Sequence, residues 1–457
     1  MAERLSARQA IAALTGATPA GAPAAFTELP APKYTAAPDG PLGWPGYDES
    51  RARAARSTGE EESVVCGTAR VGATEAVLIS FEFGFLGGSL GERTGDRLEA
   101  AYTLARERRL PVVSLTATGG SRMQEGMRAL LQLQRVARQS ALTRAAGLPQ
   151  IAVVRDPTTG GGWATLGAGA DVVLALPGAQ IGFAGSRVRP PDADPYAYTA
   201  EAQLTAGHID AVVRPEALPD TVDHWLTLLT GGPGGPAVTA ADPPAALGHA
   251  EPPATGWDAV SMARDPERPR AEAYLDAYFT SREAVGGDRC GGVDPGMLCG
   301  FGLHDGRTVA YAAQCGTATL PAGYRTAARL IRLADRLGLP VLTLVDTPGA
   351  ANDAEAERAG AGAAIADLFA AVATARVPVT SLLIGEGGSG GALALAAPGN
   401  TWATPDSYFS VIAPEPATAI LKRPPEETRT TAAQLKLRPQ DLLSLGVIRG
   451  IVPPAPS

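Results

Sequence analysis

The chain has 457 residues, of which 19% are charged, and a formal net charge of −8. A chain of this sign has no general attraction for nucleic acid or for anionic membranes, and no apolar run is long enough to cross a bilayer. We therefore expect neither nucleic acid nor membrane among its partners. The cysteines are scattered and form no C-x-x-C pair, so we expect a cytoplasmic protein with reduced thiols and no bound metal.

In chain order, the first 60 residues predict a short helix followed by an arm rich in Pro, Ala and Gly. From Ser63 the pattern becomes regular, with strand-like apolar runs at 76–83 and 111–117 and an amphipathic helix between them at 93–109. A second stretch rich in Gly and Pro interrupts this pattern, which resumes at Trp257. The expected parts are an arm at 1–60, an N-terminal half at 61–230, a linker at 231–256 and a C-terminal half at 257–457.

The two halves repeat each other. The segment LPVVSLTATGGSR at 110–122 is similar to LPVLTLVDTPGAA at 339–351, and the segment at 147–177 is similar to the one at 376–405. Both pairs are 229 positions apart. This spacing is too long for a solenoid repeat and indicates two copies of one domain, each with alternating strands and helices. The sequence therefore predicts an α/β protein made of two tandem copies.

The stretch GEGGSGGALAL at 385–395 matches both the dinucleotide fingerprint G-x-G-x-x-G and the hydrolase elbow G-x-S-x-G. The surrounding residues favour neither. A dinucleotide fold needs a full helix after the glycines, and Pro398 interrupts it early. A hydrolase of this type needs a His downstream of its serine, yet none follows Ser389, and the repeat puts Gly160 at the equivalent position.

Each copy carries two glycine turns, and each turn directly follows a strand-like run. Glycine lets a backbone N–H approach a ligand closely, and a helix start adds N–H groups that have no acceptor in the helix. Two such donors directed at one oxygen form an oxyanion hole. The alternative is that the glycines only allow a helix to pack closely on a strand. The candidate donors are Gly120, Ser121, Gly160 and Gly161 in the first copy and Gly349, Ala350, Gly390 and Gly391 in the second.

Four segments of the first copy resemble the β subunit of the bacterial acetyl-CoA carboxylase carboxyltransferase. They are FEFGFLGGSLG at 81–91, TATGGSRMQEGM at 116–127, DPTTGGGWA at 156–164 and IGFAGSRV at 181–188. Four segments of the second copy resemble the α subunit of the same enzyme. They are WDAVSMARDPERP at 257–269, DTPGA at 346–350, IGEGGSGGALAL at 384–395 and YFSVIAPEPATAIL at 408–421. The chain thus resembles a natural fusion of β and α over about residues 45–455.

This resemblance implies a crotonase-like fold, a β-β-α superhelix, in each half. It also implies transfer of a carboxyl group from carboxybiotin to acetyl-CoA or a related short acyl-CoA. The biotin would be carried on a biotin carboxyl carrier protein and charged by biotin carboxylase, and the product would be malonyl-CoA or a homologue for fatty acid or polyketide synthesis. In the family, carboxybiotin is thought to release CO2, the biotin enolate takes a proton from the thioester α-carbon, and the thioester enolate attacks CO2.

By the same resemblance, the first copy would hold the thioester oxygen and the second copy the biotin ureido oxygen, each through its four candidate donors. A homo-oligomer, at least a dimer, is also implied, in which the N-terminal half of one chain faces the C-terminal half of another. The residues expected to contact the CoA thioester or biotin are Gly119, Arg122, Phe183, Arg187, Gly387, Gly388 and Ser389.

Some of these side chains have an alternative structural role. Arg122 could pair with Glu125 rather than meet a CoA phosphate, and Arg187 could lie in solvent. Packing in the core is the favoured interpretation of Phe183. We further expect packing for Met123 and Met127 and a local backbone hydrogen bond for Glu386.

The sequence also departs from the family pattern. It lacks the four-cysteine zinc ribbon with which the β subunit usually begins. The stretch AAQCGTATLPAGYR at 312–325 has a single basic residue where α subunits often carry several. These differences keep two alternatives open, a biotin-independent malonyl-CoA or methylmalonyl-CoA decarboxylase and a non-catalytic scaffold that binds CoA.

Overall fold

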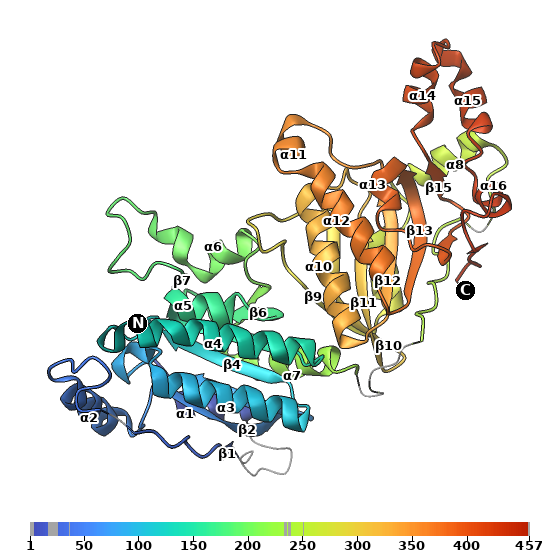
Figure 1. Cartoon of the computed structure of the whole chain (residues 1–457). Coiled ribbons are helices and arrows are strands. Elements are labelled where there is room, and N and C mark those ends of the chain that lie inside the picture. Colours follow the sequence, from blue (N-terminus) through green and yellow to red (C-terminus); the bar gives the residue numbers. More distant parts are fainter. Residues whose placement is uncertain are drawn as a thin grey trace. The chain divides into compact units, whose positions relative to one another are not determined.

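The computed structural model describes residues 4–16, 26–35, 37–232, 235, 239–249 and 251–455. The chain divides into two compact units, Met1–Thr230 and Gly231–Ser457, and each unit has its own sheet (Figure 1). Each sheet combines antiparallel strands at one side with parallel strands in its centre. The α/β class and the two tandem copies predicted from the sequence are therefore confirmed.

In the first unit the strands are β1 (Thr27–Glu28), β2 (Val64–Val71), β3 (Thr74–Phe81), β4 (Val112–Thr118), β5 (Gln150–Thr159), β6 (Val172–Ala175), β7 (Ile181–Gly182) and β8 (Ala211–Val212). They form one sheet in the order β1-β2-β3-β4-β5-β6-β8, with β7 beside β5. The helices are α1 (Ala7–Thr15), α2 (Tyr47–Thr58), α3 (Glu92–Arg108), α4 (Gly126–Ala145), α5 (Gly160–Gly162), α6 (Ala200–Thr205) and α7 (Leu218–Leu229).

Helices cover both faces of this sheet. Val77 and Ile79 of β3 pack in one cluster with Leu98 of α3 and Val136 of α4. The next residue of the strand, Ser80, points to the other face, where its hydroxyl donates to the carbonyl of Ala7 in α1 (3.0 Å). Because both faces are covered, β4 is buried along its whole length and β3 from Ala76 onward, rather than at every second residue.

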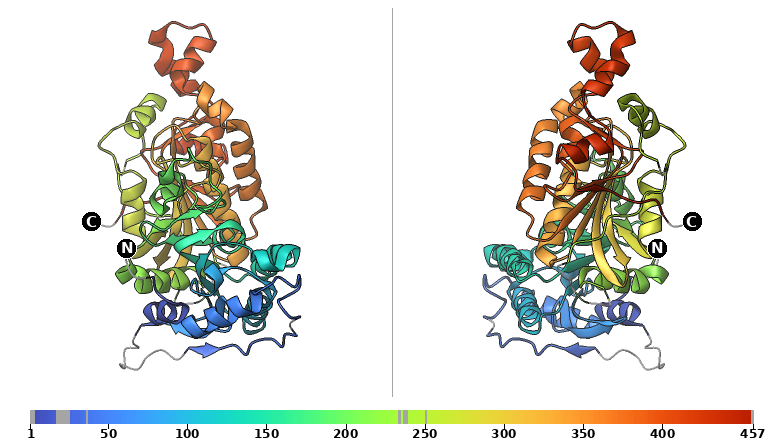
Figure 2. Two further views of the ribbon diagram at one scale, coloured as in Figure 1. Left: turned by 90° about the vertical axis from the view of Figure 1, so that its left-hand side faces the viewer. Right: turned by 90° about the vertical axis from the view of Figure 1, so that its right-hand side faces the viewer.

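The second unit has the strands β9 (Ser281–Ala284), β10 (Met297–His304), β11 (Arg307–Gln314), β12 (Val341–Thr347), β13 (Val379–Gly388), β14 (Thr401–Ala403), β15 (Tyr408–Ser410) and β16 (Gly450–Ile451). Their order is β16-β14-β13-β12-β11-β10-β9, with β15 beside β13. The helices are α8 (Gly256–Ala263), α9 (Ala271–Tyr278), α10 (Pro321–Leu337), α11 (Ala354–Arg358), α12 (Ala361–Thr374), α13 (Ser389–Leu393), α14 (Pro414–Ile420), α15 (Thr428–Gln434) and α16 (Pro439–Ser444). Helices α14 and α15 form a hairpin that stands away from the sheet of this unit (Figure 2).

The repeat seen in the sequence is also a structural repeat. The strands β4 and β12 begin 229 positions apart, and so do β5 and β13 and the short helices α5 and α13. In both units the two central strands are parallel neighbours, so their carboxyl ends lie at the same edge of the sheet. Each glycine turn follows one of these strand ends, and this topology positions the candidate site.

The N-terminal segment is less of an arm than the sequence suggested. Residues 17–25 lie outside the described residues, but α1 packs on the sheet, with Ile11 and Leu14 almost fully buried. The N–H of Ala7 donates to the carboxylate of Glu82 (2.8 Å). The described residues before 60 are therefore largely part of the first unit, because the amphipathic face of α1 finds an apolar partner there.

The expected linker is likewise packed where the structure describes it. Ala241 and Ala246 are buried in the core cluster of the second unit. The Thr380 hydroxyl donates to the carbonyl of Ala241 (2.7 Å), and the Ala246 N–H donates to the carbonyl of Pro453 (2.9 Å). Residues 239–249 thus lie against the second unit, although their composition is that of a linker.

Within the described ranges, the helices are all too short or too polar to cross a membrane. Within the same ranges, no three His, Cys, Asp or Glu side chains gather closely enough to hold a metal ion.

Candidate active site

In the first unit the structure brings the two glycine turns together. Gly120 follows β4 with a φ of +103°, and Gly160 opens α5 with a φ of +63°. A Cβ on Gly120 would lie 3.6 Å from the Cα of Gly160 and 3.8 Å from the nitrogen of Gly161. The positive φ values favour glycine at both positions, while the approach of 3.6–3.8 Å is an ordinary van der Waals contact between the two turns.

Several backbone N–H groups at these turns already have acceptors. Gly119 donates to the carbonyl of Gly87 (2.9 Å), Gly120 to the Thr118 hydroxyl (3.1 Å) and Gly160 to the carbonyl of Phe183 (3.1 Å). Within the described ranges, the N–H groups of Ser121 and Gly161 have no such acceptor. The Ser121 hydroxyl is also buried there without a hydrogen-bond partner. Of the four candidates in this copy, Ser121 and Gly161 are thus best placed to donate to a ligand.

The second unit repeats this geometry. Gly349 has a φ of +143° and donates its N–H to the Thr347 hydroxyl (3.1 Å), as Gly120 does to Thr118. A Cβ on Gly391 would clash with the nitrogen of Ala350, so these two residues lie against each other.

The glycines of the second turn of this unit differ in their surroundings. Ser389 opens α13 with a φ of +57°, close to the value of its counterpart Gly160. A Cβ on Gly388 would clash with the carbonyl oxygen of Pro348, and one on Gly387 would lie 2.8 Å from the ring of Phe409. Gly390 is exposed, with open space where a Cβ would be. The N–H groups of Gly390 and Gly391 belong to the first turn of α13, where intrahelical acceptors are lacking.

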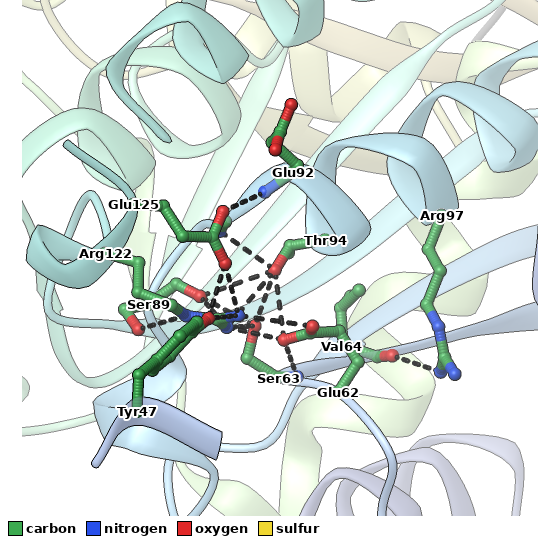
Figure 3. Close-up of polar contacts among 11 residues, drawn as sticks. Tyr47, Glu62, Ser63, Val64, Ser89, Glu92, Thr94, Arg97, Arg122 and Glu125 are labelled. Atoms are coloured by element: carbon green, nitrogen blue, oxygen red, sulfur yellow. Dashed lines mark hydrogen bonds and ion pairs between the residues drawn. The ribbon is translucent and has the colours of Figure 1, made fainter. Parts of the chain in front are cut away.

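Arg122 does not have the role expected from the resemblance. Its side chain is 1% exposed and forms ion pairs with Glu62 (2.5 Å) and Glu125 (3.3 Å) (Figure 3). The prediction that Arg122 meets a CoA phosphate is therefore wrong, because the guanidinium is enclosed by its own unit. The alternative, pairing with Glu125, is confirmed.

We expected three apolar side chains to pack in the interior, and in the single chain this expectation is wrong. Phe183 is 75% exposed, and so is Met123, while Met127 is 65% exposed. The Phe183 carbonyl accepts from the N–H of Gly160, so the backbone of Phe183 lies beside the second glycine turn. Arg187 is exposed, in agreement with the alternative that its side chain lies in solvent.

A buried carboxylate connects the two strand ends in the second unit, and the sequence did not reveal it. Asp346, the second-last residue of β12, receives two hydrogen bonds from Arg268 (2.6 and 2.7 Å) and one from the N–H of Glu386 (3.1 Å). The Glu386 carboxylate itself binds Arg264 (2.8 Å) and the hydroxyl of Tyr408 (2.7 Å). The expected local backbone bond of the Glu386 side chain is thus replaced by two side chains from other elements.

At the starts of α5 and α13 the two units share no side-chain hydroxyl. Burial raises the pKa of the Cys66 and Cys299 thiols to about 12, so both are protonated at neutral pH. The Ser389 side chain is exposed, and its counterpart Gly160 has no side chain at all. The groups that the two units share at this position are backbone N–H donors, which can stabilise negative charge on an oxygen atom.

Comparison with known proteins agrees with this division. The family of carboxyl transferase domains matches residues 45–211, and the family described as acetyl co-enzyme A carboxylase carboxyltransferase-like matches residues 253–456. Similar curated proteins include two named acetyl-coenzyme A carboxylase carboxyl transferase subunits beta/alpha. The one from Saccharopolyspora erythraea is 38% identical over 89% of this chain and 74% of its own length. The one from Salinispora arenicola is 39% identical over 95% and 81%.

Solved structures support the fold. A transcarboxylase 12S crystal structure matches with a TM-score of 0.79 and 20% identity over 99% of this chain and 87% of the other. A single-chain, multi-domain long-chain acyl-CoA carboxylase matches with a TM-score of 0.74 and 21% identity over 99% of this chain and 45% of the other. The crotonase-like fold expected in both halves is therefore confirmed. Taken with the sequence relatives, these matches show that the chain belongs to the acetyl-CoA carboxylase carboxyltransferase family, as a β-like and an α-like half fused in one polypeptide.

Proposed function

We propose that this chain transfers a carboxyl group from carboxybiotin, carried on a biotin carboxyl carrier protein, to the α-carbon of acetyl-CoA or a related short acyl-CoA. The observation that carries the proposal is the pair of glycine turns built twice, at positions 229 apart, in a chain of this family. Removing a proton from the carbon next to a thioester puts negative charge on the thioester oxygen. Loss of the carboxyl group from carboxybiotin puts negative charge on the ureido oxygen of biotin. Each reactant therefore needs its own set of N–H donors.

In the first half we assign the thioester oxygen to the N–H groups of Ser121 and Gly161, with Gly120 and Gly160 shaping the turns. The unpartnered Ser121 hydroxyl fits a site that receives a polar ligand atom. One oxyanion donor typically contributes about 3 kcal/mol to the transition state. The backbone of Phe183 contacts this turn, and we assign its exposed side chain a place against the ligand.

In the second half we assign the ureido oxygen of biotin to the N–H groups of Ala350, Gly390 and Gly391. The contact between Gly391 and Ala350 fits this group, since it brings donors from two turns close together. When bound, biotin supplies the activated carboxyl group. The chain's own part is to hold the charged oxygen through donors that need no proton transfer to or from a side chain.

The domain assignment belongs to the same proposal. We take 61–230 and 257–457 as the two catalytic halves, preceded by a segment at 1–60 without a zinc ribbon. Support comes from the family matches, which cover 45–211 and 253–456. The four cysteines are free thiols, which suits a reducing cytoplasm as the place of the reaction.

The proposed partners are a biotin carboxyl carrier protein, biotin carboxylase and further copies of this chain. The first two are supported by relatives named as subunits of biotin-dependent acyl-coenzyme A carboxylases. The third is supported by the exposed apolar side chains of α4, and the matching transcarboxylase 12S is described as a hexamer. We propose that a second copy covers this face of α4.

The test is a coupled assay. Purified protein is incubated with carboxylated carrier protein and a panel of acyl-CoA thioesters that includes acetyl-CoA and propionyl-CoA, and carboxylated CoA products are measured by mass spectrometry. We expect malonyl-CoA or a homologue, formed only when the carrier is present. Absence of any carboxylated product would contradict the proposal, and CO2 release from malonyl-CoA or methylmalonyl-CoA without biotin would favour the decarboxylase instead.

A further inference from the structure

Arg122 is two residues beyond Gly120, and its guanidinium is bound on every side. Nη2 donates to Glu62 Oε1 (2.5 Å) and to the Ser89 carbonyl (2.7 Å), and Nε donates to the Ser89 hydroxyl (3.1 Å). Nη1 donates to the Tyr47 hydroxyl (3.2 Å) and to Glu125 Oε1 (3.3 Å). Figure 3 shows these side chains converging on the guanidinium from several elements.

The backbone beside Arg122 is held as well. The Arg122 N–H donates to the Leu90 carbonyl (2.9 Å), and the Leu90 N–H donates to the Gly120 carbonyl (2.8 Å). Ser121 lies between these two bonds. The direction of its N–H is therefore set by the loop at Ser89 and Leu90, and the Arg122 side chain binds that same loop.

The network also includes the N-terminal segment. The Tyr47 hydroxyl, at the start of α2, donates to Glu125 Oε1 (2.5 Å). The other oxygen of Glu125 accepts from the N–H of Glu92 at the start of α3 (2.6 Å). Residues 75 positions apart in the sequence, Tyr47 and Arg122, are thus linked directly.

The electrostatics favour a charged network. Burial tends to raise the pKa of the Glu62 carboxyl, but Arg122 beside it lowers the pKa below its ordinary value. Two carboxylates face one guanidinium in a region closed to water, so removing the guanidinium would leave buried charge without a partner.

The fold alone does not require this arginine. The equivalent position in the second half, 229 residues on, is Ala351, and that half forms the same kind of turn. The network is therefore specific to the half that we assign to the thioester.

We propose that Arg122 is a positioning residue that holds the Ser121 N–H where it meets the thioester oxygen. Tyr47, through its hydroxyl, links the N-terminal segment to the same hydrogen-bond network. The inference rests on the proposed function for its chemistry, but its geometry can be tested independently of activity.

The test compares Arg122→Lys with a matched control, Arg97→Lys. Arg97 is also buried, donates to the Val64 carbonyl (3.1 Å) and pairs with Glu61 (3.4 Å), and neither of these bonds involves a residue of the turn. In the carrier assay we expect kcat of Arg122→Lys to fall by at least about tenfold with KM for the acyl-CoA within about twofold, because a misplaced donor weakens the transition state. We expect Arg97→Lys to keep wild-type kcat, even where both variants lose similar thermal stability.

Hydrogen exchange supplies the independent measurement. Amides of 120–122 should exchange at least about tenfold faster in Arg122→Lys and at the wild-type rate in Arg97→Lys. Tyr47→Phe keeps the ring and removes one hydroxyl, so the amides of 120–122 should exchange faster than in the wild type but by a smaller factor. This variant tests the inference if Arg122→Lys does not fold. Wild-type exchange and kcat in Arg122→Lys, or an equal loss in Arg97→Lys, would overturn the inference. A wild-type protein without carboxyltransferase activity would instead overturn the proposed function, and the exchange rates would still decide whether Arg122 holds the turn.

Discussion

At the scale of single residues, the glycines of the candidate site differ in what a side chain would meet. The three atoms nearest to a Cβ on Gly161 all belong to the Leu133 side chain, which can move. A Cβ on Gly391 would instead clash with the backbone nitrogen of Ala350 and lie 2.7 Å from the Tyr324 hydroxyl. The contact at Gly391 is between two backbone turns, so it cannot relax without moving the proposed donors.

We expect Gly391→Ala to lower kcat in the carrier assay by about a hundredfold, since a shift of about 1 Å at such donors has an effect of this size. Gly362→Ala is the control, because this exposed helical position has nothing within 4 Å of a new Cβ. The control should keep full activity and gain less than about 1 kcal/mol in unfolding free energy. Wild-type kcat in Gly391→Ala would contradict the assignment of this turn.

At the scale of elements, α4 has apolar side chains on two faces. Val136 packs in the core, while Met127, Leu130 and Leu131 are 65%, 45% and 48% exposed. A helix on the surface of a monomer normally has one apolar face, and a second one indicates a contact with another molecule.

Leu131→Glu should therefore weaken self-association, because the contact would bury a charge without a partner. Light scattering across a dilution series should show a lower mean mass for this variant than for the wild type. Arg138→Gln, which changes the charge of the same helix by one unit at an exposed position, should leave the mass unchanged. A wild-type protein that is monomeric at working concentration, or an unchanged mass for Leu131→Glu, would exclude this face as the contact.

At the scale of the whole molecule, each unit contains carboxyl groups whose pKa is lower in the folded protein than its ordinary value. Burial tends to raise the pKa of Asp288, but the N–H groups of Gly292 and Cys290 and the Arg325 guanidinium lower it below its ordinary value. The pKa is also lowered by charged partners or hydrogen bonds at Glu62, Asp335, Asp367, Glu415 and Asp441.

A carboxyl with a lowered folded pKa stabilises the fold fully above its unfolded pKa of about 4, and this stability is lost as the pH falls through the folded value. We therefore expect the free energy of unfolding, measured in urea, to decrease from pH 6 towards pH 3. Asp288→Asn should be less stable at pH 6 and lose less stability on acidification than the wild type. The exposed Glu251→Gln should follow the wild-type curve, and an unchanged acid dependence in Asp288→Asn would show that Asp288 makes no such contribution.

Much of the architecture could be predicted because it is encoded in neighbouring residues. The runs before 118 and 347, their glycine turns and the repeat at 229 positions are local patterns, and they predicted two α/β copies and both pairs of turns. A backbone donor at each first turn could be suggested from the same residues, but the N–H groups of Gly120 and Gly349 themselves donate to the hydroxyls of Thr118 and Thr347. Whether the turns meet was beyond a local pattern, because Gly120 and Gly160 are brought together only by the parallel pairing of β4 and β5.

The sequence by itself determined that this protein is a tandem of two similar α/β halves with glycine turns at matched strand ends. Only the tertiary structure decided what the surrounding side chains do. It buried Arg122 against Glu62, a residue 60 positions earlier, and it left Phe183 exposed. The physical reason is that burial and ion pairing depend on which distant segments pack together, whereas strand and turn patterns depend on adjacent residues.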